Sequence, residues 1–377
     1  MRSVLKIAIN TRLLLPGKLE GIGWFTFQSF KRIVKAHPEH RFYFLFDRKY
    51  GKEFLFADNI EPVELFPPAR HPLLYYIYFE HVVSRYLQKE GVDLFVSPDG
   101  FLAGRFGGAQ LPVFHDLNFM HQPQFIPWLT RKYYHSYFPK YAAMAKRIAT
   151  VSEYSKKDIE QTFSYPAERI DVVYNGVHAF LGPVDKETAH AVREDLCDGA
   201  PFFVYIGALH RRKNIDGLLR AFDLFKSNNQ LPHKLVLIGA TMFGTGDLKK
   251  AYRAMKNQSD VVFAGRKDDK AVRDILGSAE ALLLVSHFEG FGVPIIEAMK
   301  CEVPVIASGV TSMPEVAGDA ALLVDPLSVE QIAGAMIQIT QDNSLRNVLI
   351  ERGREQCRKF SWDLTAKRLW ESMEKCL

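Results

Sequence analysis

The amino-acid sequence predicts an α/β protein built from two doubly wound domains. Short apolar runs alternate with helical segments along residues 4–151, and the same alternation repeats along residues 202–307. Turn-forming residues cluster between these halves, at residues 175–200. A chain of 377 residues is also long for one core, so two domains of ordinary size are expected.

The first half opens with an apolar run that suits a buried strand, and a helical segment follows it at residues 22–36. Further apolar runs recur with helical stretches between them. Strands are predicted at residues 4–9, 41–46, 94–97, 111–114 and 147–151.

The second half repeats this pattern, with helices at residues 217–227 and 270–279. Strands are predicted at residues 202–206, 235–238, 261–264, 281–286 and 303–307. The final segment, residues 360–377, spaces its apolar side chains as a helix does, which predicts a helix with an apolar face to dock.

Composition excludes several classes of protein. The 47% hydrophobic and 24% charged content is typical of a globular chain, and no apolar run reaches the roughly 20 residues of a membrane span. The four cysteines show neither metal-ligand nor paired spacing, which indicates free thiols in a reducing cytoplasm. The net charge of +5 comes mainly from the first 180 residues and suits an acidic surface or substrate, but no motif favours nucleic acid.

Two glutamates flank a glycine-rich turn in the stretch SHFEGFGVPIIEAMK. Glu289 falls in the loop at the carboxyl end of a predicted strand, where open parallel sheets bind ligands, and Glu297 falls near the start of the next helix. The N–H groups of residues 291–295 are expected to point out of that helix start and favour a phosphate. Because carboxylates suit sugar hydroxyls, the loop predicts a ligand with both hydroxyl and phosphate groups. The alternative is that Glu289 is only a surface acid and that Glu297 only interacts with the helix dipole.

Three adjacent cations follow the first strand of the second half, in YIGALHRRKN. Arg211, Arg212 and Lys213 could clamp a diphosphate and stabilise its charge as it leaves. A solvated basic turn is the alternative interpretation.

The first half offers weaker candidates. Gly21 and Gly23 precede a helix, but a dinucleotide fingerprint needs a third glycine where Thr26 stands. Asp47 ends a strand and suits a ribose, so a nicotinamide cofactor stays open as an alternative. His115 follows another strand, although a lone histidine is more often structural.

Taken together, these segments resemble the nucleotide-sugar glycosyltransferases of the GT-B fold, most closely glycosyltransferase family 4, group 1, and its mannosyltransferases. The resemblance covers nearly the whole chain in the family's order. Its segments are EGIGWFT, HDLNFMHQP, TVSEYSKKDI, DVVYNGV, YIGALHRRKNIDGLLRAF, the block from Glu289 to Glu297, PVIAS and MPEVAGDAALLVDP.

The resemblance implies two Rossmann-like domains facing across a cleft, with a C-terminal helix that crosses back to the first. The implied boundaries are residues 1–180 with 361–377 for an acceptor-side domain, and residues 181–360 for a nucleotide-sugar donor domain. The expected catalytic residues are Glu289, Lys213, Arg212 and His115. The expected donor-binding residues are Gly23, Phe291, Gly292, Val293, Glu297, Gly207 and Arg266.

The matching positions imply particular contacts. Glu297 is expected at the donor's ribose hydroxyls and Glu289 near the hydroxyls of the transferred sugar. Arg212 and Lys213 are expected to hold the diphosphate, and His115 to face the sugar. The chain departs from the family at Ala208, where many members have an arginine, and at Trp24, which leaves the acceptor side open.

The implied activity is transfer of a hexose, mannose or glucose, from a GDP- or UDP-hexose to a lipid-linked saccharide in cell-surface polysaccharide or lipopolysaccharide biosynthesis. The family retains the anomeric configuration without a protein nucleophile, and neither a metal nor another cofactor is expected. A GT-B epimerase or phosphorylase and a silent nucleotide-sugar-binding scaffold are the alternatives. Aromatic and basic residues interleave in residues 71–88 and 125–147. This pattern predicts that the protein, expected in the cytoplasm, makes peripheral contact with an anionic membrane. The alternative is that the aromatic residues belong to the core.

Overall fold

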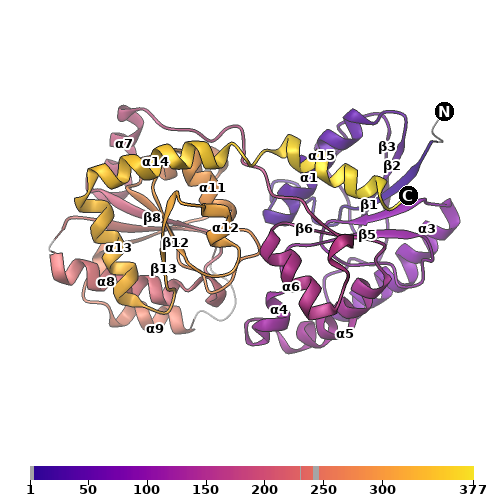
Figure 1. The fold of residues 1–377 in the computed structure, drawn as a ribbon, viewed down its shortest axis with the longest axis horizontal. Helices are drawn as coiled ribbons and strands as arrows, with labels where there is room; N and C mark the ends of the chain where they lie inside the picture. Colours follow the sequence, from indigo (N-terminus) through magenta and orange to yellow (C-terminus); the bar gives the residue numbers. More distant parts are fainter. Residues whose placement is uncertain (1–3, 230, 241–245) are drawn as a thin grey trace. The chain divides into compact units, whose positions relative to one another are not determined.

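The computed structural model describes residues 4–229, 231–240 and 246–377, which form two compact units (Figure 1). Unit 1 comprises Met1–Gly176 and Ser361–Leu377, and unit 2 comprises Val177–Phe360. The last helix of the chain therefore belongs with the N-terminal sheet.

Unit 1 contains a seven-stranded parallel sheet in the order β3-β2-β1-β4-β5-β6-β7. Its strands are β1 (Lys6–Asn10), β2 (Arg41–Phe46), β3 (Ile60–Glu64), β4 (Leu94–Ser97), β5 (Ala109–Phe114), β6 (Ile148–Thr150) and β7 (Ile170–Val172). Its α-helices are α1 (Gly21–Ala36), α2 (Pro72–Tyr76), α3 (Ser84–Glu90), α4 (Asn118–His121), α5 (Trp128–Met144), α6 (Glu153–Phe163) and α15 (Trp362–Glu374). A π-helix, η2 (Ile77–Val83), joins α2 to α3, and 3₁₀ turns occur at η1 (Lys52–Phe54), η3 (Pro123–Phe125) and η4 (Ala167–Arg169).

Unit 2 contains a six-stranded parallel sheet in the order β10-β9-β8-β11-β12-β13. Its strands are β8 (Phe202–Ile206), β9 (Lys234–Ile238), β10 (Val261–Gly265), β11 (Ala281–Leu284), β12 (Val305–Ser308) and β13 (Ala321–Val324). Its helices are α7 (Lys186–Cys197), α8 (Ile215–Asn229), α9 (Gly246–Ala254), α10 (Asp269–Ser278), α11 (Val293–Lys300), α12 (Met313–Ala317), α13 (Val329–Gln341) and α14 (Asn343–Cys357), with 3₁₀ turns η5 (Arg211–Lys213) and η6 (Gln258–Asp260).

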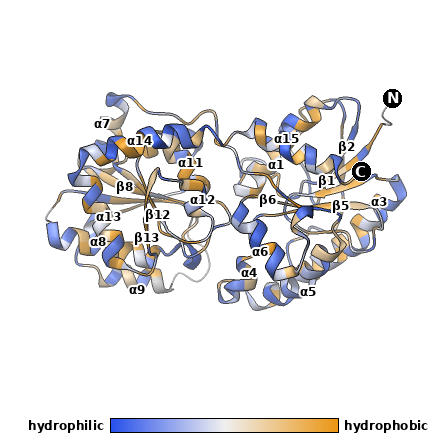
Figure 2. Cartoon of the chain, viewed as in Figure 1, coloured by the Kyte–Doolittle hydropathy of each residue, from blue (hydrophilic) through white to orange (hydrophobic). Residues whose placement is uncertain are grey.

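The central strands form because both of their faces are covered. Ile7, Ala8 and Ile9 of β1 are fully buried, as are Leu282 and Leu283 of β11. Figure 2 shows the same distribution, with apolar residues along the sheets and polar stretches on outer helices such as α3 and α14. The predicted doubly wound architecture is thus confirmed in each unit.

Three edge strands, β3, β7 and β13, are missing from the sequence prediction. The strand β3 reads IEPVE, with two glutamates and a proline, and β7 has three residues. A sheet edge tolerates charge and proline because one side of the strand needs no ladder partner. Apolar runs alone therefore do not reveal β3 or β7, whereas β13 reads ALLV and is an apolar run that the prediction left out.

Both sheets reverse their strand order at one point, between β1 and β4 in unit 1 and between β8 and β11 in unit 2. The loops that leave these strands at their carboxyl ends diverge to opposite faces and leave room for a ligand. The two reversal points therefore locate the candidate sites.

The predicted docking of the C-terminal helix is also confirmed, since α15 packs on α1. Ser361 caps its start by accepting a hydrogen bond from the Leu364 N–H at 3.2 Å. The indole of Trp370 stacks on the His37 ring with centroids 3.6 Å apart. At its other end, Lys375 contacts the Asp171 carboxylate at 2.8 Å.

Candidate active site

The main cluster of candidate residues lies at the strand-order reversal of unit 2. The strand β8 leads into Gly207 and the turn η5, while β11 leads into the loop that contains Glu289. Because β8 and β11 are neighbours in the sheet, their carboxyl ends bring the two loops together.

Glu289 is paired with both predicted cations. Its Oε1 atom lies 2.5 Å from Lys213 Nζ, and its Oε2 atom lies 3.1 Å from Arg212 Nη1. Arg212 Nη1 also donates to the Phe288 carbonyl, and the Arg212 carbonyl accepts from the His287 N–H at 2.9 Å. The three side chains form a cluster with a net charge of +1 that ties the β8 loop to the β11 loop.

The cluster keeps Glu289 ionised although the residue is only 6% exposed. Burial by itself raises the pKa of a carboxyl group, but the charges of Lys213 and Arg212 and the hydrogen bonds from Lys213 and Ser286 lower that of Glu289 to about 2. The fixed charges are therefore present at every pH near neutrality.

Hydroxyl groups that the sequence analysis did not single out complete the surroundings of Glu289. Ser286 donates to its Oε1 atom at 2.7 Å, and Ser312 donates to its carbonyl at 2.9 Å. The Glu289 N–H donates to Thr311 Oγ1 at 3.3 Å. Ser286 is the last residue of a predicted strand and Thr311 lies just beyond the next one, so their positions at strand ends were the available signal.

Glu297 is the fifth residue of α11 and is partly buried. Over residues 4–229, 231–240 and 246–377, no hydrogen bond or ion pair to its carboxylate is formed. Burial raises its pKa to about 7, and the charge of Asp269 adds to the increase. Glu297 thus differs from Glu289 in that its carboxyl group is only about half ionised near pH 7.

The start of α11 follows the predicted turn chemistry with one correction. Gly292 is the N-cap and has a φ of 95°, a conformation that favours glycine. Val293 begins the helix and Pro294 is its second residue. The expectation of free N–H groups throughout residues 291–295 was wrong, because Pro294 has none and the Ile295 N–H donates to the Gly292 carbonyl at 2.9 Å. The Phe291 ring is buried against Phe360, so a ligand here would meet backbone and not the ring.

Two more predicted donor-binding residues follow β8 and β10. Gly207 has a φ of 147°. Its carbonyl oxygen lies so close to Gly239 that a Cβ atom built on Gly239 would be only 1.8 Å from it. The loops after β8 and β9 are thus packed backbone to backbone, which explains Gly239, while the positive φ of Gly207 itself favours a glycine there. Arg266 is exposed and directly follows β10.

His115, in unit 1, follows β5 and is partly buried. Its Nε2 atom lies 2.8 Å from the Pro98 carbonyl, so Nε2 carries the ring proton and Nδ1 is left as an acceptor. The ring contacts Phe25 edge to face with centroids 5.1 Å apart. Burial lowers the pKa of His115, despite the opposing effects of the Pro98 hydrogen bond, Asp116 and Asp99. The histidine is therefore neutral at pH 7.

Gly23 lies inside α1, where a Cβ atom would come within 2.8 Å of the Leu13 carbonyl. Close packing of the preceding loop on α1 therefore requires a glycine here. Asp47, the residue considered for a ribose, is fully buried and paired with Arg48 at 2.5 Å, and it accepts a hydrogen bond from the Ala69 N–H. The Asp47 carboxylate is thus already bonded to Arg48 and to the backbone, which removes the support for a nicotinamide site.

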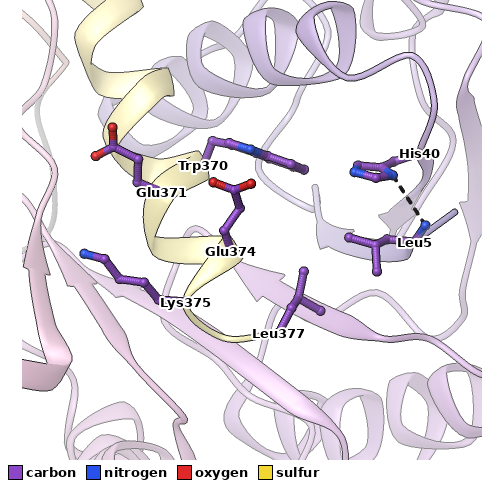
Figure 3. A pocket seen from close by; sticks show the side chains of 7 residues that line it. All are labelled: Leu5, His40, Trp370, Glu371, Glu374, Lys375 and Leu377. Atoms are coloured by element: carbon purple, nitrogen blue, oxygen red, sulfur yellow. Dashed lines mark hydrogen bonds between the residues drawn. The ribbon is translucent and has the colours of Figure 1, made fainter. Parts of the chain in front are cut away.

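A group of metal-capable side chains occurs elsewhere in unit 1, where His37, Glu39 and His40 bring ligand atoms within 4.8 Å of one another. The Leu5 N–H donates to His40 Nδ1 at 3.4 Å, which places the ring proton on Nε2, the atom that faces Glu39. A hydrogen-bonded group fits these contacts better than a metal site. His40 and Trp370 border a pocket of about 560 Å³ at the amino ends of β1 and β2, away from the candidate residues (Figure 3).

The structure therefore brings Arg212, Lys213 and Glu289 into direct contact within unit 2, and it places Glu297 on the helix that follows the Glu289 loop. His115 and Gly23 lie in the other unit. Arg211 shares the η5 turn with the two paired cations. The four cysteines are all buried and unpaired, as predicted.

Comparison with protein families gives two matches that together cover most of the chain. A model described as glycosyl transferases group 1 matches residues 187–356, and a model described as glycosyltransferase family 4 matches residues 31–179.

Curated relatives point the same way. The O-antigen chain mannosyltransferase B of Escherichia coli is 31% identical over 72% of this chain and 71% of its own length. The O-antigen chain mannosyltransferase RfbU of Salmonella typhimurium is 25% identical over 72% of this chain and 71% of its own.

Solved structures share the fold across nearly the full chain. Sucrose-phosphate synthase from Thermosynechococcus elongatus matches with a TM-score of 0.77 and 20% identity over 98% of both chains. Anabaena Alr3699/HepE in complex with UDP and glucose matches with a TM-score of 0.76 and 16% identity, over 98% of this chain and 99% of its own. These likenesses confirm the predicted GT-B fold. Within the part of the chain that the structure describes, no helix is long and apolar enough to cross a membrane.

Proposed function

The chain belongs to the group 1 glycosyltransferases of family 4, and from that premise we propose that it transfers mannose from a nucleotide diphosphate donor to a saccharide acceptor. The mannosyltransferase names of its curated relatives favour mannose over glucose. Their O-antigen names also favour a cell-surface polysaccharide as the acceptor, and we propose that this polysaccharide is lipid-linked. The observation that carries the proposal is the Glu289, Arg212 and Lys213 cluster at the carboxyl edge of the sheet in unit 2.

In this proposal the cluster serves the leaving group. Lys213 and Arg212 bind the departing diphosphate, and Glu289 holds both cations in place while its carboxylate also accepts a hydroxyl of the transferred sugar. The excess positive charge of the cluster favours the more negative state that forms as the diphosphate leaves. Because these cations can stabilise that charge, no metal is required.

The proposed reaction retains the anomeric configuration. The bond from the sugar C1 to the diphosphate oxygen breaks, and a bond from C1 to the acceptor oxygen forms on the same face. The acceptor hydroxyl proton passes to the departing diphosphate oxygen, so no protein nucleophile takes part. His115 faces the sugar and Gly23 lies near the diphosphate in this scheme.

The remaining donor contacts are assigned to unit 2. Glu297 accepts hydrogen bonds from the ribose hydroxyls, since its carboxylate has no ionic partner in the described ranges. Phe291, Gly292 and Val293 contact the sugar through backbone, in keeping with the buried Phe291 ring. Gly207 and Arg266 border the nucleotide from the ends of β8 and β10.

A thermal-shift panel tests the donor. Wild type and Glu297→Ala are heated with GDP, UDP, ADP and their hexose conjugates. A nucleotide present at about 100 times its Kd should stabilise wild type by about 2.7 kcal/mol. We expect one nucleotide to raise the midpoint and Glu297→Ala to remove that effect. If no nucleotide raises the midpoint of wild type, the nucleotide-sugar proposal is wrong.

Turnover separates an enzyme from a silent scaffold. Glu289→Ala should abolish sugar transfer and leave nucleotide binding measurable, because Glu297 and the α11 start remain. Ser328→Ala, a substitution at the exposed cap of α13, serves as the control and should keep wild-type turnover. Wild type that binds nucleotide and transfers no sugar to any lipid-linked acceptor would support the scaffold.

We also propose peripheral contact with an anionic membrane, carried by α5. Its Tyr133, Phe138 and Tyr141 are core residues, but Trp128 and Leu129 at its start are 62% and 40% exposed. Lys132 lies over the Trp128 ring at 5.5 Å, which puts a cation beside an exposed aromatic.

Flotation with vesicles rich in anionic lipid tests this contact. Wild type should float, and Trp128→Ala combined with Leu129→Ala should stay at the bottom. Vesicles of neutral lipid serve as the control. Wild type that does not float with anionic vesicles contradicts the proposal.

A further inference from the structure

The strand-order reversal of unit 1 holds a buried ion pair for which the proposed function has no role so far. Arg12 lies just after β1 and Asp99 just after β4, the two strands between which the order reverses. Their side chains are 9% and 4% exposed, and Arg12 Nε donates to Asp99 Oδ2.

Asp99 is held by several donors besides Arg12. Its Oδ1 atom accepts from Asn10 Nδ2 at 2.6 Å and from Ser97 Oγ at 3.0 Å, and the Phe101 N–H approaches at 3.4 Å. The carboxylate thus binds the end of β1 to the turn that follows β4.

Arg12 is fixed with equal firmness. Its Nη1 atom donates to the Ala69 carbonyl at 3.1 Å, and its guanidinium lies over the rings of Phe101, at 4.7 Å, and Tyr75, at 5.4 Å. Stacking on the rings and hydrogen bonds from its edge together hold the planar guanidinium of Arg12 in one orientation.

The turn that this pair holds is the one that carries the hydrogen-bond partner of His115. Pro98 lies between Ser97 and Asp99, and its carbonyl accepts a hydrogen bond from His115 Nε2–H at 2.8 Å. The turn closes with a hydrogen bond from the Gly100 N–H to the Ser97 carbonyl at 3.1 Å. A Cβ atom at Gly100 would lie 2.9 Å from the Phe114 ring, so the turn is also packed tightly on β5.

We propose that Arg12 and Asp99 are positioning residues that hold the Pro98 carbonyl and thereby fix the ring orientation and tautomer of His115. With Nε2–H bonded to Pro98, Nδ1 is the ring atom left to accept a hydrogen bond, which suits a hydroxyl group of the transferred sugar. This inference rests on the proposed function for its consequence in turnover.

A purely structural role is the competing explanation. Replacing a buried ion pair by apolar residues is often neutral or stabilising, so stability alone is a weak reason for the pair. A structural role predicts that variants lose stability while His115 keeps its tautomer. A positioning role predicts a change at the His115 ring itself.

Nuclear magnetic resonance of the full chain, labelled with ¹⁵N in histidine, reads the tautomer directly. His115→Gln assigns the signal among the 12 histidines. Wild type should show a neutral ring protonated at Nε2. Arg12→Met and Asp99→Asn should show a mixture of tautomers at His115, and their kcat should fall about 10- to 100-fold with a smaller change in the KM of the donor.

Milder and matched variants distinguish a loss of positioning from misfolding. Ser97→Ala removes one hydrogen bond to Asp99 and should shift the tautomer less than Asp99→Asn. Arg12→Lys keeps the charge without the planar fork and should restore part of the wild-type signal relative to Arg12→Met. Glu280→Gln removes the charge from the buried contact with His233 in unit 2 and should leave the His115 signal unchanged.

The outcomes separate this inference from the proposed function. If the His115 signal of Arg12→Met, Asp99→Asn and Ser97→Ala matches wild type, the positioning inference is wrong whatever happens to turnover. If the tautomer shifts in these variants but His115→Gln transfers sugar as fast as wild type, positioning is supported and the role of His115 in the proposed function is wrong.

Discussion

At the scale of single residues, Glu289 in the loop after β11 and Glu297 on α11 have opposite electrostatic surroundings. Glu289 sits between two cations, which lower its pKa to about 2, while burial raises the pKa of Glu297 to about 7. The first group is a permanent anion, and the second changes its charge in the physiological range. The two carboxyl groups should therefore respond differently to pH.

The affinity for nucleotide should follow the ionisation of Glu297. Because its pKa is raised, Glu297 is mostly protonated below about pH 7 and ionised above it, and only the ionised form accepts two ribose hydroxyls. Binding of UDP or GDP by wild type, measured by calorimetry, should strengthen about 10-fold between about pH 6 and about pH 8. Glu297→Gln supplies the control, since it reports only the titration of the nucleotide itself. Equal pH dependence in both proteins contradicts the ribose assignment.

Glu289 should instead affect stability, and only in acid. Its folded pKa of about 2 lies below the ordinary 4.5, so the stabilisation is present above about pH 4.5 and is lost as the pH falls toward 2. The linked free energy is about 3 kcal/mol. Urea unfolding of unit 2 should therefore show a gap between wild type and Glu289→Gln that narrows as the pH falls from about 5 to about 3. A gap that stays constant over this range would show that the ion pairs do not set the pKa.

The residue types in the cluster of Arg212, Lys213 and Glu289 were predictable, but their pairing was not. The sequence places Arg212 and Lys213 after one strand and Glu289 after another. Their contact depends on β8 and β11 being neighbours, which is a property of strand order. The importance of Arg12 and Asp99 was hidden for the same reason, since they meet only because β1 lies beside β4.

At the scale of elements, α15 shows how a helix distant in sequence completes a unit. Its apolar face covers α1, and polar contacts fix both of its ends, including a hydrogen bond from Ser372 Oγ to Asp171 at 2.7 Å. The near-helical spacing of its apolar residues predicted the helix, but not its partner. The short edge strands β3 and β7 were missed because an edge position relaxes the need for an apolar run, whereas β13 is a four-residue apolar run, ALLV, that was not counted as a strand.

Trp370 should contribute most of the docking energy of α15. The Trp370 side chain is 8% exposed and stacks on His37. Trp370→Ala should therefore lower the free energy of unfolding of unit 1 by about 3 kcal/mol. This is the low end for such truncations, because the ring borders a pocket. Lys367→Ala, on the exposed face of α15, should change it by less than about 0.5 kcal/mol. Denaturant unfolding measures both variants. Equal effects would mean that α15 docks by its polar ends and not by its apolar face.

At the scale of the whole molecule, the two units repeat one plan. Each has a parallel sheet whose strand order reverses beside the first strand, and each places charged residues at that reversal. The alternation of strands and helices predicted this duplication from the sequence. The polar chemistry differs, since unit 2 has a net positive cluster and unit 1 has a neutral pair beside a neutral histidine.

Unit 2 should therefore fold and bind nucleotide without unit 1. It is continuous in sequence, it has its own buried sheet, and it contains Arg212, Lys213, Glu289 and Glu297. A fragment of residues 177–360 should melt cooperatively by circular dichroism and should be stabilised by the same nucleotide as the full chain, with no sugar transfer. A matched fragment of residues 1–176 lacks α15 and leaves the apolar face of α1 uncovered, so it should aggregate unless residues 361–377 are supplied. If the 177–360 fragment folds but no nucleotide raises its midpoint, while the full chain responds, then donor binding needs residues of unit 1 as well.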